Sequence, residues 1–138
     1  NGRIPRDQVE SQQRRLDAFL SGSANPARVA RDLKRTMWSG AGIFRTEQGL
    51  QRADTEIWRL MGEPLSAASP ANLIECCTLQ NMLTTAFLVV QCALLRRESR
   101  GAHVRKDVSQ TWDAQHSPCG HTFVSLTRRG IEQRGAAA

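Results

Sequence analysis

The amino-acid sequence predicts an all-α fold, in which three helices form an antiparallel bundle followed by an irregular C-terminal tail. Two observations carry this prediction. Three stretches repeat apolar residues at helical spacing, and each begins at a residue that caps helices well. The connections between them are short and strand patterns are scarce, which is typical of helices that pack side by side.

The first helix of the bundle is predicted to begin at Asn25 and Pro26. An asparagine at the cap accepts hydrogen bonds from the free amides of the first turn, and proline suits the first helical position. The helix is expected to run to about Trp38, because Gly40 and Gly42 then interrupt the pattern. Its apolar positions are Val29, Ala30, Leu33, Met37 and Trp38.

The second helix is predicted to begin after Thr46, a capping residue. Glu47 then places a negative charge at the positive end of the helix dipole. Gly62 and Pro64 end the helix, because glycine favours a helix terminus and proline cannot continue one. Its apolar face consists of Leu50, Ala53, Ile57, Leu60 and Met61.

The third and longest helix is predicted to open at Ser69 and Pro70 and to reach residues 97–99, with Gly101 as its C-cap. At ~1.5 Å per residue it is roughly 40 Å long. After Thr85 it is apolar on every side, so we expect neighbours to enclose it. Its apolar quadrant is Leu73, Cys77, Leu88 and Leu95, and its expected neighbours are Leu33, Met37, Trp38, Ile57 and Leu60.

These elements divide the chain into three parts. Residues 1–24 are expected to form a linker and a short helix from Asp7 to Leu20, with a thin apolar stripe. Residues 25–108 form the three-helix bundle, with a spectrin-repeat-like architecture. Residues 109–138 form the irregular tail, with one short extended segment from Thr122 to Leu126. The stripe of the short helix consists of Val9, Leu16, Phe19 and Leu20.

The composition describes one globular domain with excess positive charge: 40% hydrophobic residues, 23% charged residues and a net charge of +6. No unbroken apolar run reaches the ~18–20 residues that span a bilayer, so no membrane partner is expected. A basic chain can bind nucleic acid, and a basic helical nucleic-acid-binding module is one alternative. Tyrosine is absent and Lys34 and Lys106 are the only lysines, which favours an arginine-rich protein interface instead. The chain opens at Asn1 without a methionine, as expected of a piece of a longer polypeptide.

The cysteines indicate a reducing compartment. Cys76 and Cys77 are adjacent and Cys92 lies in an apolar run, which is typical of small buried side chains rather than of disulfides. We therefore expect a cytoplasmic protein. A thiolate at Cys92, activated by the arginines that follow, is an alternative. Three possible zinc ligands lie within six residues without a CxxC pair, so a polar tail with an incidental cysteine is favoured over a zinc site: His116, Cys119 and His121.

The candidate functional segment follows the third helix. A solvated helix end would explain its charges, since arginines stabilise the negative end of a helix dipole. The small residues Ser99, Gly101 and Ala102 favour an interface instead, because they let another backbone approach while arginines pair with carbonyls or carboxylates. The predicted interdomain interface groups are Arg96, Arg97, Glu98, Arg100, His103, Arg105 and Asp107, with Lys106 among them.

No catalytic site is expected on this chain. No Gly-rich phosphate loop, nucleophile–base pair or carboxylate pair stands on a plausible scaffold. The segment is therefore expected to carry no catalytic, cofactor-binding or metal-binding residue.

Two motifs of the sequence resemble the C-terminal domain of one flavoprotein family. The stretch from Arg97 to His103, with Arg105 and Asp107 after it, is similar to the signature RxESRGxHxRxD. The stretch Met37–Thr46, MWSGAGIFRT, is similar to the segment that precedes the family's long central helix. The family comprises L-aspartate oxidase and the flavoprotein subunits of succinate dehydrogenase and fumarate reductase. The resemblance covers residues 30–108.

The resemblance is nearest to L-aspartate oxidase. It implies a parent FAD enzyme that oxidises L-aspartate to iminoaspartate in NAD biosynthesis, with FAD held upstream of this chain. It further implies that this chain is a non-catalytic domain whose partners are the flavin-binding and capping domains of the same parent, which it braces. A C-terminal fragment of a succinate dehydrogenase or fumarate reductase flavoprotein subunit is the alternative within the family.

Overall fold

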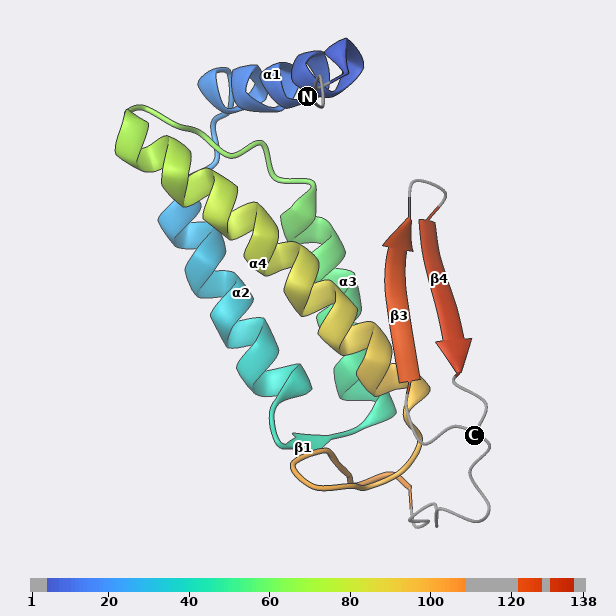
Figure 1. Cartoon of the computed structure of the whole chain (residues 1–138). Helices are drawn as coiled ribbons and strands as arrows, with labels where there is room; N and C mark the ends of the chain where they lie inside the picture. The colour runs from blue at the N-terminus through green and yellow to red at the C-terminus, as the bar shows by residue number, and fades with distance from the viewer. Residues whose placement is uncertain (1–4, 109–121, 128–129, 136–138) are drawn as a thin grey trace.

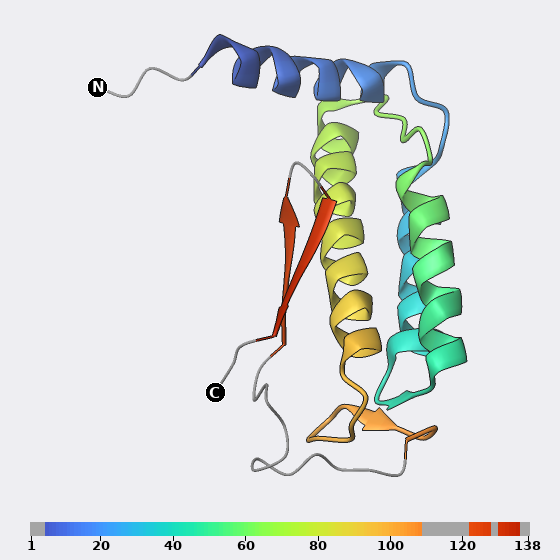
Figure 2. The same ribbon diagram turned by 90° about the vertical axis from the view of Figure 1, so that its right-hand side faces the viewer.

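A computed structural model describes residues 5–108, 122–127 and 130–135 of the chain. These ranges contain the helices α1 (Arg6–Leu20), α2 (Pro26–Ala41), α3 (Glu47–Met61) and α4 (Pro70–Leu95). They also contain the strands β1 (Phe44–Arg45), β2 (Val104–Arg105), β3 (Thr122–Thr127) and β4 (Gly130–Gly135). Helices α2, α3 and α4 pack lengthwise, α1 crosses one end of them, and the β3–β4 hairpin lies beside α4 (Figure 1 and Figure 2).

The three predicted starts of the bundle helices are confirmed. In each case the side chain of the capping residue accepts a hydrogen bond from an amide of the first turn, which would otherwise lack a partner. Proline occupies the first turn of α2 and of α4, as predicted. The caps are Asn25 Oδ1 with the amide of Ala27 (2.9 Å), Thr46 Oγ1 with Gly49 (3.0 Å) and Ser69 Oγ with Asn72 (3.2 Å).

Helix α2 runs three residues beyond its predicted end and passes through Gly40. A Cβ atom at this position would lie 2.8 Å from the Cβ of Ala53 and 2.8 Å from the carbonyl oxygen of Gly49. Glycine is therefore what lets α2 approach the first turns of α3 so closely. The glycine read in the sequence as an interruption is a contact point between helices.

The hydrophobic core lies between α2, α3 and α4. The predicted apolar face of α3 is confirmed, apart from Met61, which is partly buried. On α4 the predicted quadrant is wrong by part of a turn, because Leu73 and Cys77 are only partly buried while their neighbours face inward. The fully buried core side chains include Val29, Leu33, Leu50, Ile57, Leu60, Cys76, Leu79, Leu83, Phe87 and Val90.

Two apolar sets that the sequence placed inside are exposed. Trp38 is 86% exposed, although helical spacing put it next to the core positions of α2. On α1 only Phe19 is buried, because this helix meets the rest of the chain near its C-terminal end. There the carbonyl of Phe19 accepts the amide of Ala67 at 2.9 Å, and Arg15 donates to Gln80 at 2.5 Å.

The prediction of an all-α three-helix bundle with an irregular tail is right only in its helical character. The described residues form four helices and two small two-stranded sheets. The predicted extended segment coincides with β3, and β3 pairs antiparallel with β4 from Thr122 opposite Gly135 to Thr127 opposite Gly130. The tail is therefore not irregular over these strands. Residues 109–121, 128–129 and 136–138 lie outside the described residues.

Helix α4 ends at Leu95, earlier than predicted, because Arg96 takes an extended conformation while its amide still donates to Cys92. Gly101 is consequently not its cap. By length and composition α4 could cross a membrane, since an 18-residue window has a mean hydropathy of 1.5, even though no unbroken apolar run is that long. The core helix of a soluble protein passes the same test, and 33% of that window is buried here.

Candidate functional site

The charged segment after α4 folds back onto the connection between α2 and α3. Strand β2 pairs in parallel with β1, with Phe44 opposite Val104 and Arg45 opposite Arg105. The amide of Lys106 donates to the carbonyl of Arg45 at 2.9 Å. The two stretches that carry the family resemblance, far apart in the sequence, are thus joined at one end of the helices (Figure 1).

A tight turn brings the segment to this position. Arg100 and His103 exchange two backbone hydrogen bonds, of 2.8 and 3.0 Å, around Gly101. Gly101 has a φ of +57°, a conformation that favours glycine, and it has the only positive φ in the described part of the chain. Ser99 Oγ accepts the amide of Arg105 at 2.9 Å and so fixes the strand after the turn.

Arg105 is the centre of the segment, and its side chain is 1% exposed. A guanidinium has five N–H donors, and here each meets an acceptor. Nε and Nη2 donate to the two oxygens of Asp107 at 2.9 and 3.0 Å, and Nη2 also donates to Glu47 at 2.7 Å. Nη1 donates to the carbonyls of Ala93 (3.2 Å) and Arg96 (3.4 Å), which end α4. Arg105 therefore ties the last turn of α4 to the first turn of α3.

Asp107 completes this connection. Its Oδ2 accepts the backbone amide of Glu47 at 2.5 Å, at the positive end of α3. The hydrogen bonds from Arg105 hold the pKa of the Asp107 carboxyl well below its usual range, and the same bonds raise the pKa of Arg105. We call Arg105, Asp107 and Glu47 the clamp.

His103 is neutral in this arrangement. Its Nε2 lies 3.0 Å from the carbonyl oxygen of Arg96, and its Nδ1 lies 2.6 Å from Nη1 of Arg45. A carbonyl can only accept and a guanidinium can only donate, so Nε2 carries the proton and Nδ1 accepts. Burial lowers the pKa of His103, and the charges of Arg45, Arg105 and Arg96 lower it further against the opposing effect of the backbone hydrogen bond.

The other predicted residues divide between a buried and an exposed set. Glu98 is buried and pairs with Arg96 at 3.5 Å and with Arg100 at 3.2 Å. Arg97 is 67% exposed and lies 3.6 Å from Glu47, and about half of the Arg100 side chain is exposed. The buried groups are thus satisfied inside the chain, while the exposed arginines face outward at the same end.

The structure brings all seven predicted residues together, and their role as interface groups stays a prediction. Sequence reasoning missed their partners on the α2–α3 connection. Glu47 was read only as a helix-dipole charge, and Arg45 only as part of a motif. The available signal was the second motif itself, since Arg45 belongs to it and Glu47 follows it directly.

The chemistry of this arrangement is structural. Its buried cations and carboxylates are paired with one another, and the described residues contain no group of three or more His, Cys, Asp or Glu side chains that could hold a metal ion. The candidate zinc ligands His116, Cys119 and His121 lie outside the described residues. The clamp can fix helix ends, and it can present Arg97 and Arg100 to a neighbour.

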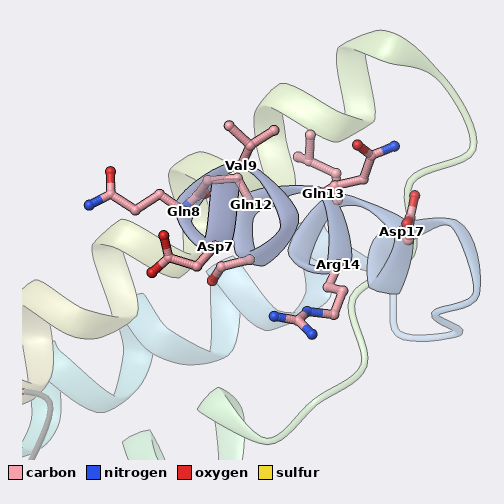
Figure 3. A pocket seen from close by; sticks show the side chains of 9 residues that line it. Asp7, Gln8, Val9, Gln12, Gln13, Arg14 and Asp17 are labelled. Atoms are coloured by element: carbon pink, nitrogen blue, oxygen red, sulfur yellow. The ribbon is translucent and has the colours of Figure 1, made fainter. Parts of the chain in front are cut away.

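A hollow along α1 provides no second site. It is lined by residues of α1 alone, and Figure 3 shows their side chains radiating from the helix rather than converging on one point. A space bounded by one helix is the surface of that helix, not a cavity between elements. The labelled side chains are Asp7, Gln8, Val9, Gln12, Gln13, Arg14 and Asp17.

Curated proteins of known families resemble the chain over much of its length. The fumarate reductase (CoM/CoB) of Methanothermobacter marburgensis contains one polypeptide that is 39% identical over 108 residues, covering 74% of this chain and 20% of the relative. The fumarate reductase flavoprotein subunit of Mycobacterium tuberculosis is 33% identical over 94% of this chain and 24% of its own length. L-aspartate oxidase 1 of Ralstonia nicotianae is 41% identical over 86 residues, covering 58% and 15%. The chain thus spans about a quarter or less of these relatives.

The fold also occurs in solved structures. The chain of an E. coli quinol fumarate reductase FrdA variant matches with a TM-score of 0.82 and 24% identity, over 96% of this chain and 25% of that one. A family model described as "Fumarate reductase flavoprotein C-term" matches residues 30–134, which include the clamp and the hairpin. The chain therefore belongs to the family of fumarate reductase flavoprotein C-terminal domains.

Proposed function

We propose that this chain is the C-terminal helical domain of a longer FAD-dependent oxidoreductase, and that it braces the flavin-binding and capping domains without activity of its own. The clamp is the observation that carries the proposal. Every N–H of the Arg105 guanidinium is used by an acceptor inside the chain, so this group can hold two helix ends in place but offers nothing to a substrate. The match to relatives about four times longer supports a parent with further domains.

FAD does not fit the described residues of this chain. A dinucleotide's pyrophosphate is held at a Gly-rich turn between a strand and a helix. The one such junction here that joins a strand directly to a helix, from β1 to α3, is capped by Thr46, and its first amide is taken by Asp107. We therefore propose that upstream domains hold FAD, and we derive no step through it here.

The exposed half of the charged segment is the proposed contact with those domains. Arg97 and Arg100 lie there together with the exposed side chains of Ile43 and Phe44, and Lys106 sits 4.6 Å above the Phe44 ring. Apolar contacts ringed by arginines are typical of protein interfaces. Arg100→Ala should leave the helicity of the 138-residue chain intact and lower the melting temperature of the longer protein. Unfolding of the 138-residue chain itself would assign Arg100 to internal packing and end this part of the proposal.

Two reactions are candidates for the parent enzyme. Oxidation of L-aspartate to iminoaspartate is supported by the 41% identity to an L-aspartate oxidase and by the wording of the Met37–Thr46 stretch. Reduction of fumarate or oxidation of succinate is supported by matches that extend further along the chain, including one over 94% of it.

Assays of the longer protein with each substrate separate these candidates. L-aspartate oxidation is followed as iminoaspartate formation, succinate oxidation as reduction of an electron-accepting dye, and fumarate reduction as oxidation of a reduced viologen. Turnover of one substrate pair identifies the reaction, and turnover of none sinks both candidates.

A cytoplasmic location is part of the same proposal, supported by Cys76, a buried thiol whose pKa is raised by burial and which is therefore unreactive. The nucleic-acid alternative is less well supported, since the arginines of the segment pair with carboxylates of the chain. Filter binding at two salt concentrations tests it, because phosphate contacts weaken steeply with salt. Affinity for DNA or RNA at low salt that disappears at high salt would favour that alternative.

A further inference from the structure

Helix α4 is more apolar than its surroundings require. Its 18-residue window of mean hydropathy 1.5 is only 33% buried, although a helix that is apolar on every side is normally enclosed on every side. Within the described part of the chain, α2, α3 and β3 cover three of its sides (Figure 1 and Figure 2). One side remains open.

The open side is a continuous stripe along the helix. Its members recur every three or four residues, so they share one face. Met82 is 38% exposed and Val89 is 40% exposed. The hydroxyls of Thr78 and Thr85 donate to carbonyls one turn back, both at 2.9 Å, so these polar groups are satisfied within α4. The stripe consists of Ile74, Thr78, Asn81, Met82, Thr85 and Val89.

The stripe forms one wall of a groove, and α2 forms the other. Leu33 and Met37 of α2 and Ala86 of α4 line its apolar floor, while Lys34 and Asn81 stand among its polar lining groups. Its volume is about 500 Å³. An apolar groove between two packed helices suits a third helix, which inserts side chains at the same three- and four-residue spacing.

We propose that the α2–α4 groove seats a helix from the flavin-bearing part of the parent protein, an inference that rests on the proposed function. The relatives place most of the available covering surface outside this chain, since the matched region is 20% to 25% of their length. A lipid surface suits the groove less well, because lipid-binding helices present protruding apolar side chains flanked by many cations. Here the apolar groups are recessed between two helices.

Site-specific photo-crosslinking tests the seat directly. Met82 is replaced by a benzophenone amino acid in the longer protein, and the cross-linked peptide is identified by mass spectrometry. The control is the same replacement at Leu16, which is 39% exposed on α1, outside the groove. We expect Met82 to cross-link to a peptide upstream of Asn1 and Leu16 not to reach that peptide. A cross-link to a second copy of the chain, or none, overturns the inference.

A charge substitution supplies the second arm. Val89→Glu should leave the melting temperature of the 138-residue chain nearly unchanged and lower the Met82 cross-link yield by about tenfold, because a carboxylate buried without a partner is strongly unfavourable. Leu16→Glu is the matched control and should leave the yield unchanged. Binding of the 138-residue chain to anionic phosphatidylserine vesicles that Val89→Glu abolishes would replace the helix with a lipid face.

The two proposals can fail separately. A longer protein without flavin absorbance refutes the proposed function. A longer protein that carries flavin but gives no cross-link from Met82 refutes the seat alone.

Discussion

Replacing Arg105 by methionine tests the clamp. Methionine keeps the length and apolar stem of the side chain but removes all five N–H donors, leaving Asp107 and Glu47 without their buried cation. Breaking a buried ion pair by removing one partner costs about 3–5 kcal/mol. Because the Glu47 and Asp107 side chains are 35% and 29% exposed and can rehydrate, we expect about 3 kcal/mol, the low end of that range. For a chain of this size that lowers the melting temperature by about 10 °C.

Arg97→Met is the matched control. It removes the same charge from the same segment, and it also loses a contact with Glu47, but from an exposed side chain at 3.6 Å. A surface pair of this kind contributes about 0–1 kcal/mol. Urea unfolding of the 138-residue chain, followed by circular dichroism, measures both variants. Equal destabilisation by the two substitutions would refute the reasoning, since the cost would then come from net charge and not from the clamp.

Three further predictions concern other contacts. Because the pKa of His103 is lowered in the folded chain, the unfolded state takes up the proton first, so stability should fall as the pH drops through about 6.5; His103→Gln should flatten that slope, and equal slopes in both proteins would contradict the assignment. Gly40→Ala should destabilise by about 1–3 kcal/mol, because the new Cβ meets Ala53 and the Gly49 carbonyl at 2.8 Å, whereas the control Gly62→Ala, whose nearest neighbour is 3.5 Å away, should be nearly neutral in urea unfolding. Gly101→Ala should cost about 1–2 kcal/mol through its φ of +57°, and Gly101→Asn should cost less; equal melting temperatures for the two variants would contradict the strained turn.

The helices could be predicted because their signals are local. Asn25, Thr46 and Ser69 cap the helices that follow them through bonds within one turn, so a short window of sequence contains the cause. The exposure of Trp38 could not be predicted, because helical spacing sets only the direction of a side chain and not where its neighbours end. The end of α4 was missed for a similar reason, since Arg96 leaves the helix to follow a strand pairing with residues 44–45.

The candidate segment was found by its density of charge, but its internal partners were not. Nothing local connects Arg105 to Glu47, and only the parallel pairing of β1 with β2 brings the two together. The hairpin was half predicted. Strand β3 alternates polar and apolar residues, while β4, with the sequence GIEQRG, has one apolar side chain and no such pattern.

The flavin absorbance of the purified 138-residue chain, measured after incubation with FAD and beside the longer protein, tests the central claim most directly. The account predicts a colourless chain that is inactive toward L-aspartate, succinate and fumarate, and a longer protein with a flavin spectrum. A 138-residue chain that retains FAD or turns over any of these substrates alone would contradict it.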